Sequence, residues 1–253
     1  MKVILIGSGN VNTVLARLIT TKGHTIEQVY SRHLEHAQQL AAQHNATATD
    51  DLAALAKTAD AYIISVSDNA LPEVAALLRL EDKVVVHTTG AAPVKTLEAC
   101  SSRYGVLYPV QSLRKELQHL PEIPLTVDGN DDETRALILS FAQTLSAVTQ
   151  VADDNQRLKM HVAAVFVSNF TNFLYAQAEA YCNFENIQFN SLLPLIQEVA
   201  SRIKESSPAK VQTGPAIRRD FVTIERHLQL LEAYPQLSEL YKFLTDGVLE
   251  FYR

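Results

Sequence analysis

The stretch Val3–Asn12, VILIGSGNVN, decides the fold of the first half of this 253-residue chain. A run of four apolar residues breaks into Gly-x-Gly, and a helical pattern follows. In a dinucleotide-binding domain the first glycine permits a tight turn from strand to helix, and the second lets the backbone approach a pyrophosphate. The N–H groups that open the helix then bind the anion. The residues predicted to bind a dinucleotide in this way are Gly7, Ser8, Gly9, Asn10 and Val11.

The third position of this fingerprint departs from the usual pattern. It is commonly Gly or Ala, which allow close packing of helix on strand, and here it is Asn12. A lone Gly-x-Gly can also be a tight turn in an α/β domain that binds no nucleotide. That alternative stays open on the motif alone.

Short apolar runs alternate with helical patterns through residues 1–150. The runs that predict strands are Val3–Ile6, Thr25–Tyr30, Ala61–Val66, Lys83–Val86, Gly105–Val110 and Ile123–Val127. The helical patterns are Asn12–Thr21, Leu34–His44, Asp51–Ala56, Leu71–Leu78, Val94–Cys100 and Asp131–Leu145. Such alternation predicts an α/β fold: a Rossmann-like, doubly wound parallel sheet with helices on both faces. We expect residues 1–150 to be the nucleotide-binding domain.

The character of the sequence changes after residue 150. Residues 153–181 contain no Gly or Pro and predict one continuous helix that begins at Asp153 or Asp154. Further helices are expected at Ser191–Lys204, Ala216–Leu231 and Gln236–Phe251. We expect residues 151–253 to form an all-α domain that binds substrate and makes a homodimer, because a helix apolar on several faces needs burial on more than one side.

Composition excludes several classes of partner. The net charge of −6 and the lack of any block of like charges argue against nucleic acid and anionic membranes. The two cysteines have no metal-ligand spacing, so we expect a reducing compartment and no metal. No membrane span and no signal peptide stand out in the sequence. We expect a cytoplasmic protein with a small-molecule substrate.

The end of the second predicted strand indicates which dinucleotide is bound. An acidic residue there would hydrogen-bond the free ribose of NAD, but this chain has Ser31 and Arg32. A hydroxyl and a guanidinium suit the 2′-phosphate of NADP. Alternatively, Arg32 lies on a solvated first turn of the next helix.

Polar residues also follow the later strands, where sheets of this type place their ligands. Val66, Ser67 and Asp68 are expected at the cofactor. Thr88 and Gly90 after the fourth strand, and Pro109 and Gln111 in the stretch that starts at Tyr108, are expected at the substrate. The alternative is ordinary turn chemistry, because loops use the same residues.

A polar stripe follows the long predicted helix. His161, Ser168, Asn169 and Asn172 recur at offsets of seven, eight and eleven, which places them on one face of a regular helix. The stripe either satisfies hydrogen bonds in a core or reaches a ligand. We assign catalysis to His161, Asn169 and Asn172, with His161 giving a proton and Lys159 as its rival.

A second motif covers residues 212–220, QTGPAIRRD. Thr213 and Arg218 are expected to bind an anionic group of the substrate at a helix start. Alternatively, the arginines pair on the surface with Asp220 or Glu225.

Taken together, these motifs resemble a bacterial family whose members are described as candidate NADP oxidoreductases. The resemblance spans the whole chain and rests on residues 7–11 (GSGNV), 30–32 (YSR), 87–90 (HTTG), 108–112 (YPVQS), 163–172 (AAVFVSNFTN) and 212–220. It implies a Rossmann-like domain followed by a helical domain of unknown function. The family is distantly similar to pyrroline-5-carboxylate reductase and the 6-phosphogluconate dehydrogenase superfamily, which implies that the long helix lines the active site and helps to form dimers.

One departure limits what the resemblance implies about the reaction. The β-hydroxyacid dehydrogenases of that superfamily use a Lys and an Asn one helical turn apart. Here Ala163 lies four residues after Lys159, and Val165 lies four residues after His161, so that pair is not carried over.

Our leading hypothesis is an NADP-dependent reductase that transfers a hydride between NADPH and a small C=O or C=N metabolite at the interdomain cleft. The main alternative is a non-catalytic NADP(H)-binding redox sensor. A structural protein that binds no nucleotide is the third.

Overall fold

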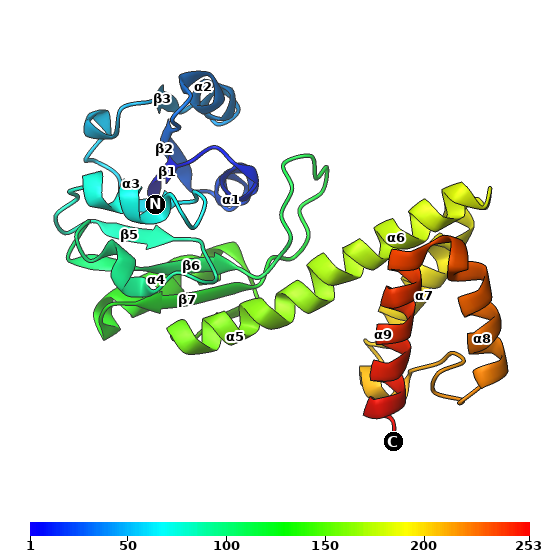
Figure 1. Cartoon of the computed structure of the whole chain (residues 1–253). Helices are drawn as coiled ribbons and strands as arrows, with labels where there is room; N and C mark the ends of the chain where they lie inside the picture. Colours follow the sequence, from blue (N-terminus) through cyan, green and yellow to red (C-terminus); the bar gives the residue numbers. More distant parts are fainter. The chain divides into compact units, whose positions relative to one another are not determined.

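The computed structural model describes residues 1–253, which divide into two compact units (Figure 1). The first unit is Met1–Asn169 and the second is Phe170–Arg253. The sequence places the functional boundary at residue 150, and that division into a cofactor domain and a substrate domain stays a prediction. None of the helices is both long and apolar enough to cross a membrane.

The first unit is built on one eight-stranded sheet (Figure 1). The strands run in the order β3-β2-β1-β4-β5-β6-β7-β8. Their bounds are β1 Lys2–Ile6, β2 Thr25–Tyr30, β3 Thr47–Thr49, β4 Ala61–Ile64, β5 Val84–His87, β6 Arg103–Pro109, β7 Leu125–Gly129 and β8 Thr149–Val151. The strand order reverses between β1 and β4, and this is the point where doubly wound sheets bind ligands.

Helices cover both faces of the sheet, as predicted. α1 (Asn10–Thr21), α2 (Leu34–Ala42) and α4 (Asp132–Leu145) pack on one face. α3 (Leu71–Leu77) and a 3₁₀ turn at Val94–Leu97 pack on the other. Successive side chains of a strand point to opposite faces, and β1 therefore contributes residues to both buried clusters. This explains why a continuous apolar run opens the chain.

The sheet differs from the prediction in its far half. Six parallel strands were expected, but β7 pairs antiparallel with β6, and β8 pairs parallel with β7. β3 and β8 have three residues each, which is too short to give a detectable alternation. The strand predicted at Ile123–Val127 begins at Leu125, because Pro124 has no N–H for the ladder.

Several predicted helices are shorter in the structure. Only 3₁₀ turns form within the predicted helices at 51–56 and 94–100, at Leu52–Ala54 and Val94–Leu97. The helix expected from Ala216 begins at Phe221, because Asp220 caps it by accepting a hydrogen bond from the Thr223 N–H.

The long predicted helix is not regular throughout. α5 (Asp154–Ala164) and α6 (Thr171–Phe184) are joined by a π-helical segment at Val165–Phe170. A π turn takes an extra residue, so the periodicity of a regular helix does not hold across it. The prediction that His161, Asn169 and Asn172 share one face was therefore based on the wrong period.

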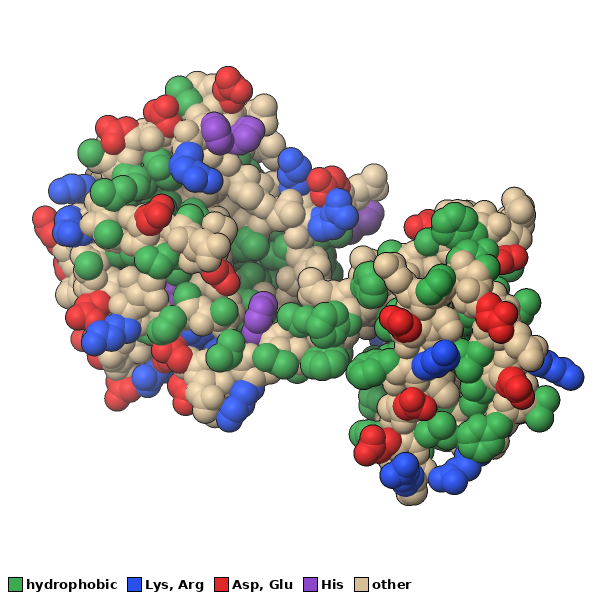
Figure 2. All heavy atoms as spheres, in the orientation of Figure 1, with side chains coloured by type: hydrophobic (Ala, Val, Ile, Leu, Met, Phe, Trp, Pro, Cys, Tyr) green, Lys and Arg blue, Asp and Glu red, His purple; other side chains and the backbone are tan.

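The second unit contains α6, α7 (Leu193–Arg202), α8 (Phe221–Leu230) and α9 (Pro235–Phe251). Its buried apolar residues are Cys182, Ile224 and Leu231. Many large apolar side chains are exposed, and Figure 2 shows such side chains across the visible face of this unit. The helices of this unit therefore leave many of their large apolar side chains uncovered by one another.

Candidate active site

A cleft of about 570 Å³ lies at the carboxyl ends of β1, β4 and β5 in the first unit. The loops that follow these strands line it, together with the start of α1 and the side chains of Tyr108 and His161. The cleft thus lies where the strand order reverses, and the residues that line it include those predicted to bind the cofactor.

The turn after β1 is shaped by glycine. Gly7 has a φ of 106°, and a Cβ at this position would lie 2.3 Å from the carbonyl oxygen of Ser65. A Cβ on Gly9 would meet no protein atom within 4 Å. The backbone at Gly9 is therefore open toward the cleft, where a ligand can approach the N–H groups that begin α1.

Asn12 explains the unusual third position of the fingerprint. Its side chain is fully buried, and its Nδ2 donates hydrogen bonds to the carbonyl oxygens of Ile6 and Gly7, at 3.1 and 2.8 Å. These bonds fix the end of β1 and the start of the turn. A polar residue at this position thus holds the turn in shape from inside the domain.

The end of β2 forms one side of the cleft. Ser31 is buried, and its hydroxyl lies 3.0 Å from that of Ser8 in the glycine turn. Arg32, His33 and His36 also line this side of the cleft. Hydroxyl, guanidinium and imidazole groups are donors that match a phosphate.

The other end of the cleft brings a tyrosine and a histidine together. The Tyr108 Oη lies 3.1 Å from the His161 Nδ1, and the rings meet edge to face with centroids 6.0 Å apart. Burial raises the pKa of Tyr108, and the nearby Arg157 partly opposes this shift. The Thr88 hydroxyl donates to Ser65 Oγ at 2.9 Å beside the pair. This end of the cleft can therefore hold and move a proton.

Two buried side chains lie behind this end. Burial, with a further contribution from Arg157, lowers the pKa of His87 to about 4. Arg157 is 1 % exposed, and its Nη2 donates to the Ala92 carbonyl and to Asp154 Oδ1. Its Nε and Nη1 have no hydrogen-bond partner in the protein. The site is thus backed by a neutral imidazole and a buried guanidinium.

The structure brings most of the predicted site residues together. All ten residues predicted at the cofactor line the cleft, namely Gly7, Ser8, Gly9, Asn10, Val11, Ser31, Arg32, Val66, Ser67 and Asp68. Thr88, Gly90 and His161 line it as well. These placements agree with the predicted roles without testing them.

Other predicted residues do not line this cleft. Pro109 is buried in β6, and Gln111 is exposed in the loop after it. Asn169 and Asn172 are exposed on and after the π turn. Thr213 and Arg218 are exposed in the second unit. The predicted site roles of these six residues stay predictions.

The sequence prediction missed several cleft residues. Tyr108 opens a stretch that was singled out, but Pro109 and Gln111 were selected from it. The alternation along β6 could have suggested Tyr108, because Val106 and Tyr108 lie two residues apart and pack in one cluster with Val94. His33 and His36 follow directly on Ser31 and Arg32, so their place after β2 could have suggested them.

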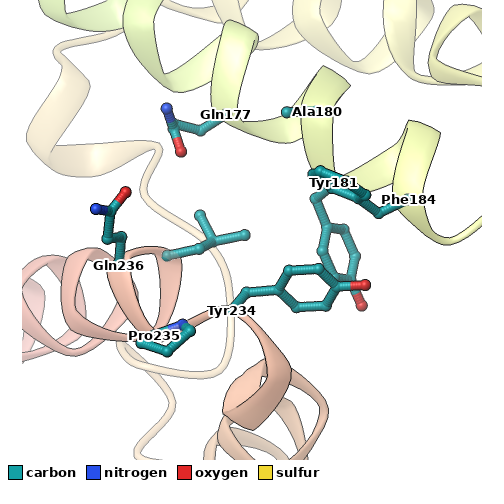
Figure 3. A pocket seen from close by; sticks show the side chains of 8 residues that line it. Gln177, Ala180, Tyr181, Phe184, Tyr234, Pro235 and Gln236 are labelled. Atoms are coloured by element: carbon teal, nitrogen blue, oxygen red, sulfur yellow. The ribbon is translucent and has the colours of Figure 1, made fainter.

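A second hollow, of about 400 Å³, lies within the helical unit between α6 and the start of α9 (Figure 3). The Tyr181 and Tyr234 rings meet edge to face beside it at 5.4 Å. Tyr234 donates a hydrogen bond to Glu185, which raises the pKa of Tyr234. No glycine lines this hollow, whereas the cleft of the first unit contains the glycine turn after β1 and is therefore the candidate active site.

The fold and the cleft define a nucleotide-binding protein of the doubly wound class with an added helical unit. Residues 2–90 match a family described as NADP oxidoreductase, coenzyme F420-dependent. Residues 123–247 match a domain of unknown function, DUF2520. No curated protein matches the chain.

Solved structures share this architecture over nearly the whole chain. A candidate NADP oxidoreductase from Bacteroides fragilis is 38 % identical, with a TM-score of 0.91 and 98 % of each chain covered. The chain belongs to the same family, in which an NADP oxidoreductase domain precedes a DUF2520 domain. NADP is accordingly its cofactor class.

More distant structures show the same fold. An imine reductase from Myxococcus stipitatus in complex with NADP⁺ is 16 % identical, with a TM-score of 0.66, and the match covers 100 % of this chain and 93 % of that one. A 1-pyrroline-5-carboxylate reductase from Streptococcus pyogenes is 15 % identical, with a TM-score of 0.65 and coverage of 99 % and 98 %.

Proposed function

We propose that this protein is an NADPH-dependent reductase acting on a small metabolite with a C=O or C=N bond. The observation that carries the proposal is that one cleft contains the glycine turn after β1, the donor groups of Ser31 and Arg32 after β2, and the hydrogen-bonded pair of Tyr108 and His161 at its other end. Imine and pyrroline-5-carboxylate reductases share the fold, and their names specify C=N substrates. The family match to residues 2–90 covers the nucleotide-binding part and leaves the second reactant open.

The residues present fit NADP. The open backbone at Gly9 and the start of α1 would hold the diphosphate, and Ser31 with Arg32 would hold the 2′-phosphate. When bound, NADPH supplies the hydride. His161 would give a proton from its ring to the oxygen or nitrogen of the reduced bond. Asn169, Asn172, Thr213 and Arg218 stay predictions.

Calorimetry tests the cofactor part of the proposal. Arg32→Ala removes the guanidinium that would bind the 2′-phosphate, so NADPH binding should weaken at least tenfold. NADH has no 2′-phosphate, and its binding should stay nearly unchanged. Arg103→Ala is the matched control, because Arg103 is at the start of β6, at the opposite end of the strands, and pairs with Glu133. Equal affinity of wild-type protein for NADPH and NADH would contradict the assignment of NADP.

Turnover tests the reductase part. Saturating NADPH with a panel of imines, 2-keto acids and aldehydes, followed at the nicotinamide absorbance, should show oxidation by wild-type protein. In His161→Ala the turnover rate should fall far more than the affinity for NADPH, because general acid catalysis contributes about 10²-fold or more to the rate. Tight NADPH binding without turnover across the panel would favour a sensor.

We further propose that the protein forms a homodimer through its helical unit. The support is the imbalance in that unit between its few buried and many exposed apolar side chains. Large exposed apolar surface on a folded unit marks an interaction site.

A further inference from the structure

Three segments meet at His161. The imidazole Nδ1 lies 3.1 Å from the Tyr108 Oη, which β6 carries to the edge of the cleft. A Cβ at Gly90, in the loop after β5, would lie 2.8 Å from the His161 Nδ1 and 3.0 Å from the Tyr108 ζ carbon. Only glycine leaves room at position 90 for both rings. The His161 and Tyr108 rings are therefore held together by packing against Gly90 as well as by their hydrogen bond.

The start of α5 is tied to the same loop. Asp154 Oδ1 accepts a hydrogen bond from the Val94 N–H at 2.9 Å, and Arg157 Nη2 donates to the Ala92 carbonyl at 2.5 Å. Arg157 lies one helical turn before His161. These bonds hold the helix that carries His161 against the loop that carries Gly90. The position of the imidazole is thus fixed from both the helix and the loop.

The two ring nitrogens of His161 have different surroundings. Nδ1 faces the Tyr108 hydroxyl, whereas Nε2 makes no hydrogen bond within the protein and is reached by solvent. A hydroxyl can donate to one group and accept from another, so it can serve either tautomer. A nitrogen that exchanges protons must be free to take one up when the ring is neutral. A ring that exchanges protons at Nε2 therefore carries its fixed proton on Nδ1 and donates it to the Tyr108 oxygen.

We propose that Tyr108 is a positioning residue that fixes the tautomer of His161, with Gly90 providing the space for the pair, so that Nε2 is the nitrogen that exchanges protons with the substrate. This rests on the proposed reductase function. In the proton-transfer step, the bond from Nε2 to hydrogen breaks and a bond from hydrogen to the substrate oxygen or nitrogen forms. The protonated ring becomes neutral with its remaining proton on Nδ1, and the Tyr108 oxygen accepts that hydrogen bond.

The tautomer can be measured without any substrate. Ring ¹⁵N correlation spectra at about pH 8, where an ordinary histidine is neutral, should show His161 with one proton-bearing nitrogen, Nδ1. The His161→Gln spectrum assigns the signal. Tyr108→Phe removes only the hydroxyl and should give a mixture of tautomers. Tyr104→Phe on the same strand is the matched control and should leave the His161 signals as in the wild type.

Kinetics gives the second readout. With a substrate found in the panel, Tyr108→Phe should lower kcat about tenfold, with NADPH affinity unchanged. Gly90→Ala should also give a mixture of His161 tautomers, because the added methyl group displaces the ring from Tyr108. A wild-type His161 spectrum in Tyr108→Phe would overturn the inference. Absence of turnover in wild-type protein would instead overturn the reductase proposal and leave the spectral result standing.

Discussion

The two glycines of the turn after β1 make different demands at the level of single residues. Gly7→Ala places a methyl group against the Ser65 carbonyl at a φ of 106°, so it should lower Tm and abolish NADPH binding. Gly9→Ala meets no protein atom, so Tm should fall little. Its methyl group would still stand in the path of a diphosphate, and NADPH binding should fall at least tenfold. Thermal melts and calorimetry on both variants check this, and full NADPH affinity in Gly9→Ala would refute the placement of the diphosphate.

His87 should make stability depend on pH. Burial lowers its folded-state pKa to about 4, below the ordinary value near 6.5. Below the ordinary value the unfolded chain binds a proton that the folded chain does not, so stability is full above about pH 6.5 and is lost as pH falls toward 4. At pH 5 the loss from this residue should be about 2 kcal/mol.

Denaturant unfolding at pH 7.5 and pH 5 measures that loss. His87→Gln should show a smaller difference between the two pH values than wild-type protein, by about the amount given above. His24 and His44 keep their own contributions in the variant, because burial also lowers the pKa of each. The same difference in both proteins would show that His87 does not titrate in this way.

At the scale of elements, the joint between α5 and the loop after β5 rests on an asymmetric pair. Arg157 is fully buried, whereas the Asp154 side chain is 46 % exposed. Removing the carboxylate leaves a buried guanidinium without its counter-charge, which is costly, but replacing the guanidinium with a hydrophobic group of similar size can be nearly neutral. Asp154→Ala should therefore lower the free energy of unfolding by about 2 kcal/mol, and Arg157→Met by less.

Equilibrium unfolding in urea compares the two variants. Asp153→Ala serves as a control for simple loss of a helix cap, because the Asp153 carboxylate caps α5 by accepting from the Gln156 N–H, whereas the Arg157 guanidinium pairs with Asp154. A larger loss in Arg157→Met than in Asp154→Ala would mean that the guanidinium stabilises the joint by itself.

The sequence predicts those elements that carry a residue pattern over several consecutive positions. The apolar run of β1, its glycine turn and the polar ends of β2, β4 and β5 each carry a residue pattern, and their residues meet in one cleft. β3 and β8 are too short for a pattern, and their pairing depends on neighbouring strands. The π turn at Val165–Phe170 also lacks a local signal, which is why the stripe containing Asn169 was predicted with the period of a regular helix.

Contacts between distant segments are the part of the site that spacing does not predict. Tyr108 and His161 are 53 residues apart in sequence and meet only because α5 returns to the loop after β5. A single sequence shows the polar character of each residue, but it does not show which of them will be neighbours.

At the scale of the whole molecule, the two units differ in how completely they bury their apolar residues. The sheet of the first unit is covered by helices on both faces, and a cluster of buried apolar residues lies on each face. The second unit leaves Leu195 on α7 and Phe243 on α9 exposed at 58 % and 76 %. Uncovered surface of this kind costs free energy in water unless it is buried on association. A second copy of the same unit offers a matching apolar surface, as a two-fold interface requires.

Light scattering after size exclusion should therefore give the mass of a dimer for wild-type protein. Leu195→Ser and Phe243→Ser, alone and combined, should shift the mass toward that of the monomer, because each places a hydroxyl in a surface that association would bury. Leu77→Ser is the matched control, because Leu77 is 71 % exposed but belongs to α3 in the first unit. A monomeric wild type, or a dimer that only Leu77→Ser dissociates, would refute association through the helices, and the exposed apolar side chains would then need another partner.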